Sequence, residues 1–193
     1  QKILLVNLSK GRIGDINAGL LGMVLVGKIL MAALSRVDIR DPNARRDFNL
    51  YIDEFQNFTT ESIATILSET RKYALNLTMA HQFIGQLTEK IRDAVFGNVG
   101  SLICFRVGAD DAEFLEKQFA PVFSKSDLIN IANFHAYVRL LIRGSTTPPF
   151  SLETLVGTKG NPAIADAVKK ISRLRYGRDL KDIEADIMGR LRI

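Results

Sequence analysis

The sequence predicts an α/β domain in which helices cover both faces of a mainly parallel sheet. Apolar runs of strand length alternate along the chain with stretches of helical periodicity. Continuously apolar strands that are separated by helices are typical of a parallel sheet buried on both faces. Apolar residues make up 47% of the 193 residues and charged residues 24%, a balance that supports a packed core and excludes a disordered or fibrous chain.

Five apolar runs are predicted to form the strands, and loops with glycine, proline or charged residues separate them from the helices. The expected strands are residues 3–6, 48–52, 75–80, 101–107 and 134–142. The first expected helix follows the loop 7–17 and ends near residue 36. The second begins at a cap, Thr59 or Thr60, and ends near residue 73. The others are expected over 84–96, 110–119 and 126–131.

The most apolar segment, Ala18–Leu34, tests whether the chain enters a membrane. It contains Lys28 near its middle and three glycines. We interpret it as a buried helix and expect no membrane span in these residues. One cysteine and two histidines exclude a disulfide scaffold and argue against a zinc site, and a reducing compartment fits. The formal charge of +5 permits an acidic or nucleic-acid partner.

The chain changes character after Ser145, so we divide it into a domain over residues 1–150 and a linker with a helical tail over 151–193. The run Thr146–Pro149 is expected to be a stiff extended linker. Two helices broken near Tyr176-Gly177 are expected in the tail, and residues 151–193 carry nine basic and six acidic residues.

The strongest chemical signal is the strand 48–52 followed directly by Asp53 and Glu54. A hydrophobic strand that ends in Asp-Glu is the Walker B pattern of P-loop ATPases. A rigid strand there holds Asp53 near the Mg²⁺ that bridges the nucleotide phosphates, and it places Glu54 where a carboxylate polarises the attacking water. The alternative interpretation is a solvated acidic pair at a strand exit, and this motif alone leaves the two about equal.

A second signal is Gln82, which follows the strand 75–80. One right-handed strand–helix–strand crossover brings the ends of both strands to the same edge of the sheet. Gln82 is then within reach of the γ-phosphate or of the attacking water. The alternative is that Gln82 caps the next helix, and the residue by itself favours this simpler role.

A third signal is Arg71-Lys72, at the end of the helix expected between those two strands. An arginine there lies far from the Asp53 edge of its own sheet. In a ring of subunits it could face the nucleotide of a neighbouring subunit, where a guanidinium neutralises charge on the γ-phosphate. The alternative is an ordinary favourable interaction with the helix C-terminus, worth less than about 1 kcal/mol.

The loop Ser9–Gly14 lies between a strand and a helix and is therefore the place to look for a phosphate loop. It does not match GxxxxGK[ST], because Lys10 precedes the glycines and Asp15 stands where a phosphate would be repelled. We reject it as a Walker A loop. Lys10 and Arg12 are interpreted as exposed loop charges, with contact to DNA or a neighbouring subunit as the alternative.

These segments together resemble one family. The order 3–11, then Tyr51–Gln56, then Glu69–Tyr73, then Ala80–Leu87 is similar to the HerA/FtsK branch of RecA-fold ATPases, and within it to the conjugative coupling proteins of type IV secretion (TraG/TraD-like). The resemblance covers roughly residues 2–150. It implies that Asp53 and Glu54 form the Walker B pair with Mg²⁺ and ATP, that Gln82 is the polar sensor, and that Arg71 is the finger offered to the next subunit.

The resemblance also implies an architecture and a set of partners. The fold would be part of a three-layer RecA-like P-loop NTPase sheet followed by a helical tail. The family forms hexameric rings that move DNA with ATP, alongside secretion or repair proteins, in the cytoplasm or at the cytoplasmic face of the inner membrane through a segment outside these residues. The Walker A loop lies upstream in that family. The alternatives are a HerA-like repair translocase or helicase and a non-catalytic adaptor that retains the fold.

The missing phosphate loop generates a prediction for the 193-residue chain by itself. Backbone N–H groups and a lysine around the β- and γ-phosphates supply most of the affinity for a nucleoside triphosphate, and no glycine-containing loop here has that arrangement. We expect calorimetry with Mg-ATP to show no specific binding and no hydrolysis. Micromolar binding would show that a phosphate loop of another form is present.

Overall fold

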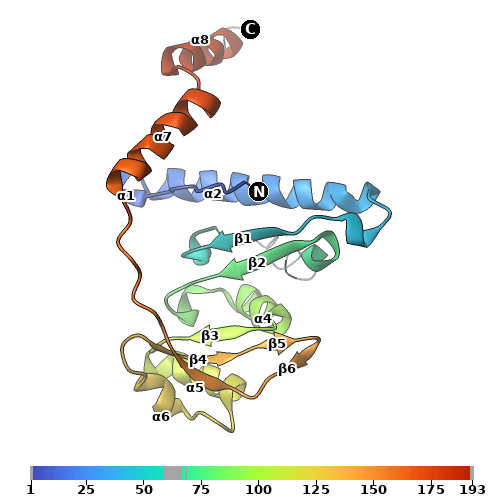
Figure 1. The fold of residues 1–193 in the computed structure, drawn as a ribbon, viewed down its shortest axis with the longest axis vertical. Helices are drawn as coiled ribbons and strands as arrows, with labels where there is room; N and C mark the ends of the chain where they lie inside the picture. The colour runs from blue at the N-terminus through green and yellow to red at the C-terminus, as the bar shows by residue number, and fades with distance from the viewer. Residues whose placement is uncertain (1, 59–66, 68, 192–193) are drawn as a thin grey trace. The chain divides into compact units, whose positions relative to one another are not determined.

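The computed structural model describes residues 2–58, 67 and 69–191. It divides the chain into two compact units, Gln1–Thr154 and Leu155–Ile193, and each is described by itself (Figure 1). The first unit contains the strands, and the helices of the second unit follow them in sequence. Together they form an α/β chain, as the sequence predicts.

The first half of unit 1 pairs helices with two strands. A short helix, α1, is followed by the long helix α2, and the strands β1 and β2 run side by side (Figure 1). The bounds are α1 Lys10–Ile13, α2 Asp15–Leu34, η1 Ser35–Asp38, η2 Pro42–Ala44, β1 Phe48–Ile52, η3 Phe55–Phe58, η4 Thr70–Tyr73 and β2 Leu75–Met79.

The second half of unit 1 contains three more α-helices, one 3-10 helix and five more strands in the part of the chain that the structure describes. The bounds are η5 Ile84–Gln86, α4 Glu89–Asn98, β3 Leu102–Cys104, α5 Ala109–Phe119, α6 Lys125–Ile129, β4 His135–Arg139, β5 Leu141–Ile142, β6 Ser145–Thr146 and β7 Phe150–Glu153. The chain starts α6 with a capping box, in which Ser124 and Asp127 satisfy each other's backbone N–H groups.

Strands β1 and β2 are parallel, as predicted. Phe48 lies opposite Leu75, and the register continues without a bulge to Ile52 opposite Met79. One connection leads from β1 to β2, so both strands end at the same edge. The ladder continues past the assigned strands, because the Ala80 N–H donates to the Ile52 carbonyl at 2.9 Å and the Phe55 N–H donates to the Ala80 carbonyl at 3.1 Å.

The expectation of a mainly parallel sheet is wrong for the other described strands. The sheet β3–β4–β7 is antiparallel throughout, and β5 and β6 form a separate two-stranded hairpin. The run Thr146–Pro149, expected to be a linker, connects β6 to β7. Strand β7 spans the predicted boundary at 150/151, and unit 1 ends at Thr154. A two-residue turn at Arg143-Gly144 connects β5 to β6, and Gly144 has a φ of +84°, a conformation that suits glycine.

The core of unit 1 consists of two apolar clusters. One lies between β1, β2 and α4, and the other lies between β3, α5 and α6. The buried residues of the first are Ile52, Phe55, Leu87, Ile91 and Val95, and those of the second are Ile84, Cys104, Ala112, Leu115, Phe119, Leu128 and Ile131.

Two N-terminal expectations are also wrong in part. The apolar run 3–6 forms no strand in this structure, and its side chains are exposed, with Leu5 87% accessible. A strand needs the backbone of a neighbour, and none of the described strands pairs with this run. Helix α2 was expected to be buried, but only Ala18, Gly22 and Ala33 are buried along it. The segment Asp15–Asp38 is long and apolar enough to cross a membrane, a test that core helices of soluble proteins also pass.

Unit 2 consists of an extended segment and two helices, α7 Pro162–Tyr176 and α8 Leu180–Leu191. Asn161 caps α7 by accepting a hydrogen bond from the Ala163 N–H at 3.0 Å, and Pro162 occupies the first turn. The break expected near Tyr176-Gly177 is confirmed.

A buried carboxylate ties η5 to α5 in the second half of unit 1 and makes the fold testable. Both carboxylate oxygens of Asp111, near the start of α5, accept from the Ile84 N–H, at 3.2 and 3.0 Å. Asp111→Ala leaves that buried N–H without a partner, so we expect the free energy of unfolding to fall by about 1–3 kcal/mol in urea titration. Asp110→Ala is the matched control, because Asp110 is exposed in the same helical turn. Equal losses in the two variants would contradict this role.

Candidate functional site

The polar residues predicted at the strand ends meet at one edge of the β1–β2 pair. Asp53 and Glu54 follow β1 directly, and Gln82 follows β2 after two residues. Because Ile52 and Met79 are opposite each other in a parallel register, the chain leaves both strands at the same level. The Gln82 amide nitrogen donates to Glu54 Oε1 at 2.7 Å. The structure therefore brings together two of the residues that the sequence singled out.

Two amide side chains hold the Glu54 carboxylate. Gln82 donates to Oε1, and Gln56 donates to Oε2 at 2.6 Å, so each carboxylate oxygen has its own donor. Gln56 lies in η3, only two residues after Glu54, whereas Gln82 comes from the other strand. A carboxylate held on both sides has a fixed orientation at the strand edge, and releasing either amide would free one oxygen.

These contacts favour the charged form of Glu54. The hydrogen bonds from Gln82 and then Gln56 lower the pKa of Glu54, and the positive charge of Lys10 acts in the same direction, while partial burial opposes them. Glu54 is consequently ionised and a weak proton acceptor as long as both amides hold it. A stronger base would require one of them to move.

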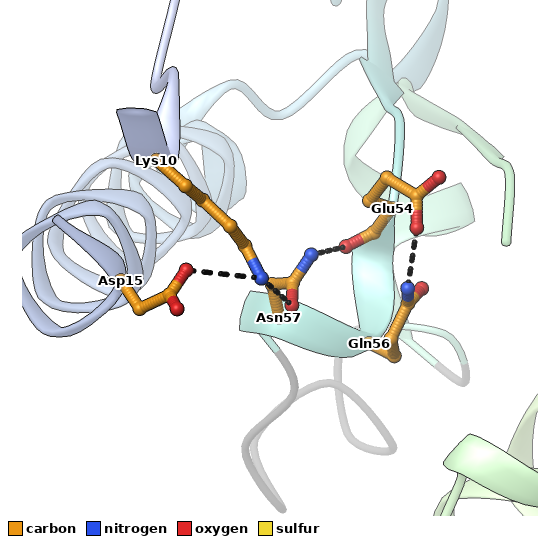
Figure 2. A network of polar contacts seen from close by, with 5 residues as sticks. All are labelled: Lys10, Asp15, Glu54, Gln56 and Asn57. Carbon is orange, nitrogen blue, oxygen red and sulfur yellow. Dashed lines mark hydrogen bonds and ion pairs between the residues drawn. The ribbon is translucent and has the colours of Figure 1, made fainter. Parts of the chain in front are cut away.

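The backbone of Glu54 is held as firmly as its side chain (Figure 2). Glu54 has a φ of +50°, which few non-glycine residues adopt. Its carbonyl accepts from the Asn57 backbone N–H at 3.0 Å and from Asn57 Nδ2 at 3.1 Å. The Lys10 ammonium donates to Asn57 Oδ1 at 2.9 Å and also pairs with Asp15 at 3.3 Å. Lys10 therefore ties the segment before α2 to the turn that carries Glu54.

Sequence reasoning missed three members of this network. Gln56 and Asn57 follow the Asp-Glu pair directly, and two amides in a turn after a strand are the signal that would have pointed to them. Lys10 was interpreted as an exposed loop charge, but it contacts the turn that follows β1. No local pattern predicts that contact, because 47 residues separate Lys10 from Asn57.

Asp53 is the residue that the sequence assigned to a metal. Its side chain is exposed, and Oδ1 accepts from the Glu54 N–H at 3.0 Å. Mg²⁺ binds proteins through one or two carboxylates and keeps several waters and phosphate oxygens as its other ligands. An exposed carboxylate at the strand edge fits such a site, and Asp53 would be the protein ligand in it.

Arg71 lies at the opposite end of β2. Its backbone belongs to η4, directly before the strand, while the side chain lies outside what the structure describes, as do Thr59 and Thr60 of the expected helix. Arg36 Nη1 donates to the carbonyls of Tyr73 at 2.6 Å and Ala74 at 3.1 Å, and thus anchors the turn that follows. The backbone of Arg71 is therefore separated from Glu54 by the length of a strand, and its action on a neighbour stays a prediction.

The segment that carries these residues matches a known family. Residues 47–127 fit the family model described as the TraM recognition site of TraD and TraG. This span includes Asp53, Glu54, Arg71 and Gln82. The resemblance to TraG/TraD-like proteins is confirmed. A search of curated proteins found no match.

Solved structures of conjugative coupling proteins share the fold of this chain. The unbound bacterial conjugative coupling protein TrwBdeltaN70 is similar with a TM-score of 0.61 and 16% identity, over 79% of this chain and 40% of that one. The plasmid coupling protein TrwB in complex with the ATP analogue ADPNP gives a TM-score of 0.60 at 17% identity, over 79% of this chain and 39% of that one. At such identities the likeness shows the fold. The chain spans about 40% of the length of these coupling proteins.

The two amides that hold Glu54 give a prediction on protonation. Gln82→Ala removes the largest cause of the lowered pKa, so we expect the pKa of Glu54 to rise toward its ordinary value, as followed by carboxyl NMR titration of the 193-residue chain. A carboxyl group whose pKa is lowered in the folded state stabilises the fold at pH values above its ordinary pKa. This contribution is lost as the pH falls through the lowered pKa.

Gln86→Ala is the control for that titration, because Gln86 is an exposed glutamine in the neighbouring η5 turn. An unchanged pKa in Gln82→Ala would show that Gln82 does not hold the carboxylate in solution.

Proposed function

We propose that this chain is the C-terminal part of the motor domain of an ATP-driven conjugative coupling protein that moves DNA. The observation that carries the proposal is the contact between Glu54 and Gln82 beside the exposed Asp53, at one strand edge of a TraG/TraD-like segment. The similar protein TrwB was solved with ATP and GTP analogues, which supports a nucleotide as the ligand.

Each residue has a distinct role in the proposed reaction. Asp53 would hold the hydrated Mg²⁺, and the bound metal would neutralise charge on the phosphates. Glu54 orients the attacking water and accepts its proton at the carboxylate. Gln82 contacts Glu54 directly, so a γ-phosphate that attracts the Gln82 amide would release Oε1 of Glu54 for the water. Arg71 acts on the nucleotide of the adjacent subunit.

The proposal includes the partners that the family implies. The intact protein would form a hexameric ring around DNA and contact proteins of the secretion apparatus at the cytoplasmic face of the inner membrane. The match of residues 47–127 to a segment described as a TraM recognition site supports a conjugation partner over a role in DNA repair. The phosphate loop would come from the upstream part of the motor domain.

Turnover by the full-length protein tests this assignment. We expect Glu54→Gln to keep ATP affinity and to lower turnover by about 10²-fold or more, because the amide cannot accept a proton from the water. Glu89→Gln is the matched control, since Glu89 is an exposed glutamate at the start of α4. Near-normal turnover in Glu54→Gln would overturn the role of Glu54. A wild-type protein that hydrolyses no ATP with DNA present would favour the non-catalytic adaptor.

A further inference from the structure

Helix α7 in the tail has an apolar stripe along one side. Its members are spaced by three or four residues, which places them on one face of a helix. They are Ile164, Val168, Ile171 and Leu174, with 63%, 57%, 61% and 87% of their surface exposed. Leu155 and Val156, in the extended segment before α7, are also exposed, at 97% and 79%. The stripe is therefore a continuous apolar surface that no described residue of unit 2 covers.

The opposite side of α7 is basic. The helix contains four basic residues and one acidic residue. Lys169, Lys170 and Arg173 lie away from the stripe, whereas Arg175, four residues after Ile171, lies on its side. Lys169 pairs with Asp166 at 3.3 Å, whereas Lys170 and Arg173 have no ion pair among residues 155–191. Arg178 follows directly after the helix and pairs with Asp186 of α8 at 2.7 Å. Most of the positive charge on α7 is thus unneutralised within its own unit.

The sequence specifies α7 as a helix but gives it no partner. Asn161 and Pro162 form a strong start signal, and Gly177 stands at the end. An isolated helix of this length is only marginally stable in water. A surface that covers the stripe would therefore also stabilise the helix.

We propose that α7 binds the surface of an anionic lipid bilayer. Its apolar stripe would enter the boundary between headgroups and acyl chains, while Lys169, Lys170 and Arg173 would contact the anionic headgroups. An apolar face combined with a basic face is the pattern of helices that lie in a membrane interface. This binding is separate from the nucleotide chemistry of unit 1.

Other occupants satisfy only half of the pattern. Duplex DNA would neutralise the cations but leave the four apolar side chains in water. A second apolar helix would cover the stripe but leave the cations unpaired. Helix α8 of the same unit does not cover the stripe, because all four apolar side chains of α7 remain exposed beside it. An anionic bilayer satisfies both faces at once.

A reporter on α7 tests the proposal without interference from the exposed apolar helix α2. Val168→Cys in the 193-residue chain is labelled with a polarity-sensitive dye, and Asp166→Cys is labelled as the matched polar-face position. Cys104 does not compete, because it is buried and burial raises the pKa of its thiol to about 11. We expect a blue shift at 168, and a much smaller one at 166, with vesicles of phosphatidylglycerol and phosphatidylcholine, and none with phosphatidylcholine alone.

A matched pair of charge variants tests the basic face. Lys170→Gln/Arg173→Gln and Lys181→Gln/Arg190→Gln remove one lysine and one arginine each, the first pair from α7 and the second from α8. We expect the α7 pair to weaken vesicle binding, read at the 168 reporter, by about 10-fold or more, and the α8 pair to leave it within about 3-fold.

Three results would overturn the proposal. One is an unshifted reporter at 168 with saturating anionic vesicles. Another is an unshifted reporter at 168 together with a loss of duplex DNA binding in the Lys170→Gln/Arg173→Gln variant, which would assign the basic face to nucleic acid. The third is a blue shift that rises with protein concentration in the absence of vesicles, which would assign the stripe to a second copy of the chain.

Discussion

The parallel pairing of β1 with β2 is the constraint on which the candidate site depends. Five residue pairs in unbroken register end both strands at the same level, so Glu54 and Gln82 are adjacent although 28 residues separate them. The apolar cluster around Ile52, Phe55 and Ile91 fixes this pair of strands against α4. A slip of one residue would turn the buried side chains outward, so the register that protects the core also sets the geometry of the site.

The turn after β1 shows how a strained backbone is maintained. Glu54 occupies a left-handed conformation, a cost that the surrounding contacts offset. Asn57 donates two hydrogen bonds to the Glu54 carbonyl, and Lys10 orients Asn57. Gln56 and Gln82 hold the Glu54 carboxylate. All of these contacts are polar and partly exposed. The turn can therefore rearrange at lower cost than the buried strands beneath it, a property that suits a group whose hydrogen bonds change during a reaction.

Two exposed apolar surfaces among the described residues differ in the charges around them. The run 3–6 and α2 are apolar with few charges nearby. Helix α7 instead alternates its apolar stripe with cations. Burial in a protein core would require each of those cations to be desolvated or paired, which is costly. A polar, anionic interface removes this cost, and that difference separates the tail from the rest of the chain.

The sequence by itself determined the α/β class, the parallel pair β1–β2, the strand-end position of Asp53, Glu54 and Gln82, and the two tail helices. These features depend on local periodicity, on caps and on one crossover rule, all of which are encoded within short stretches. Tertiary structure decided the rest. The antiparallel sheet β3–β4–β7, the exposure of residues 3–6 and the contact of Lys10 with Asn57 depend on which distant segments meet. An apolar run has the same sequence pattern whether the neighbouring strand is parallel, antiparallel or missing. Only the assembled backbone therefore fixes how the strands pair.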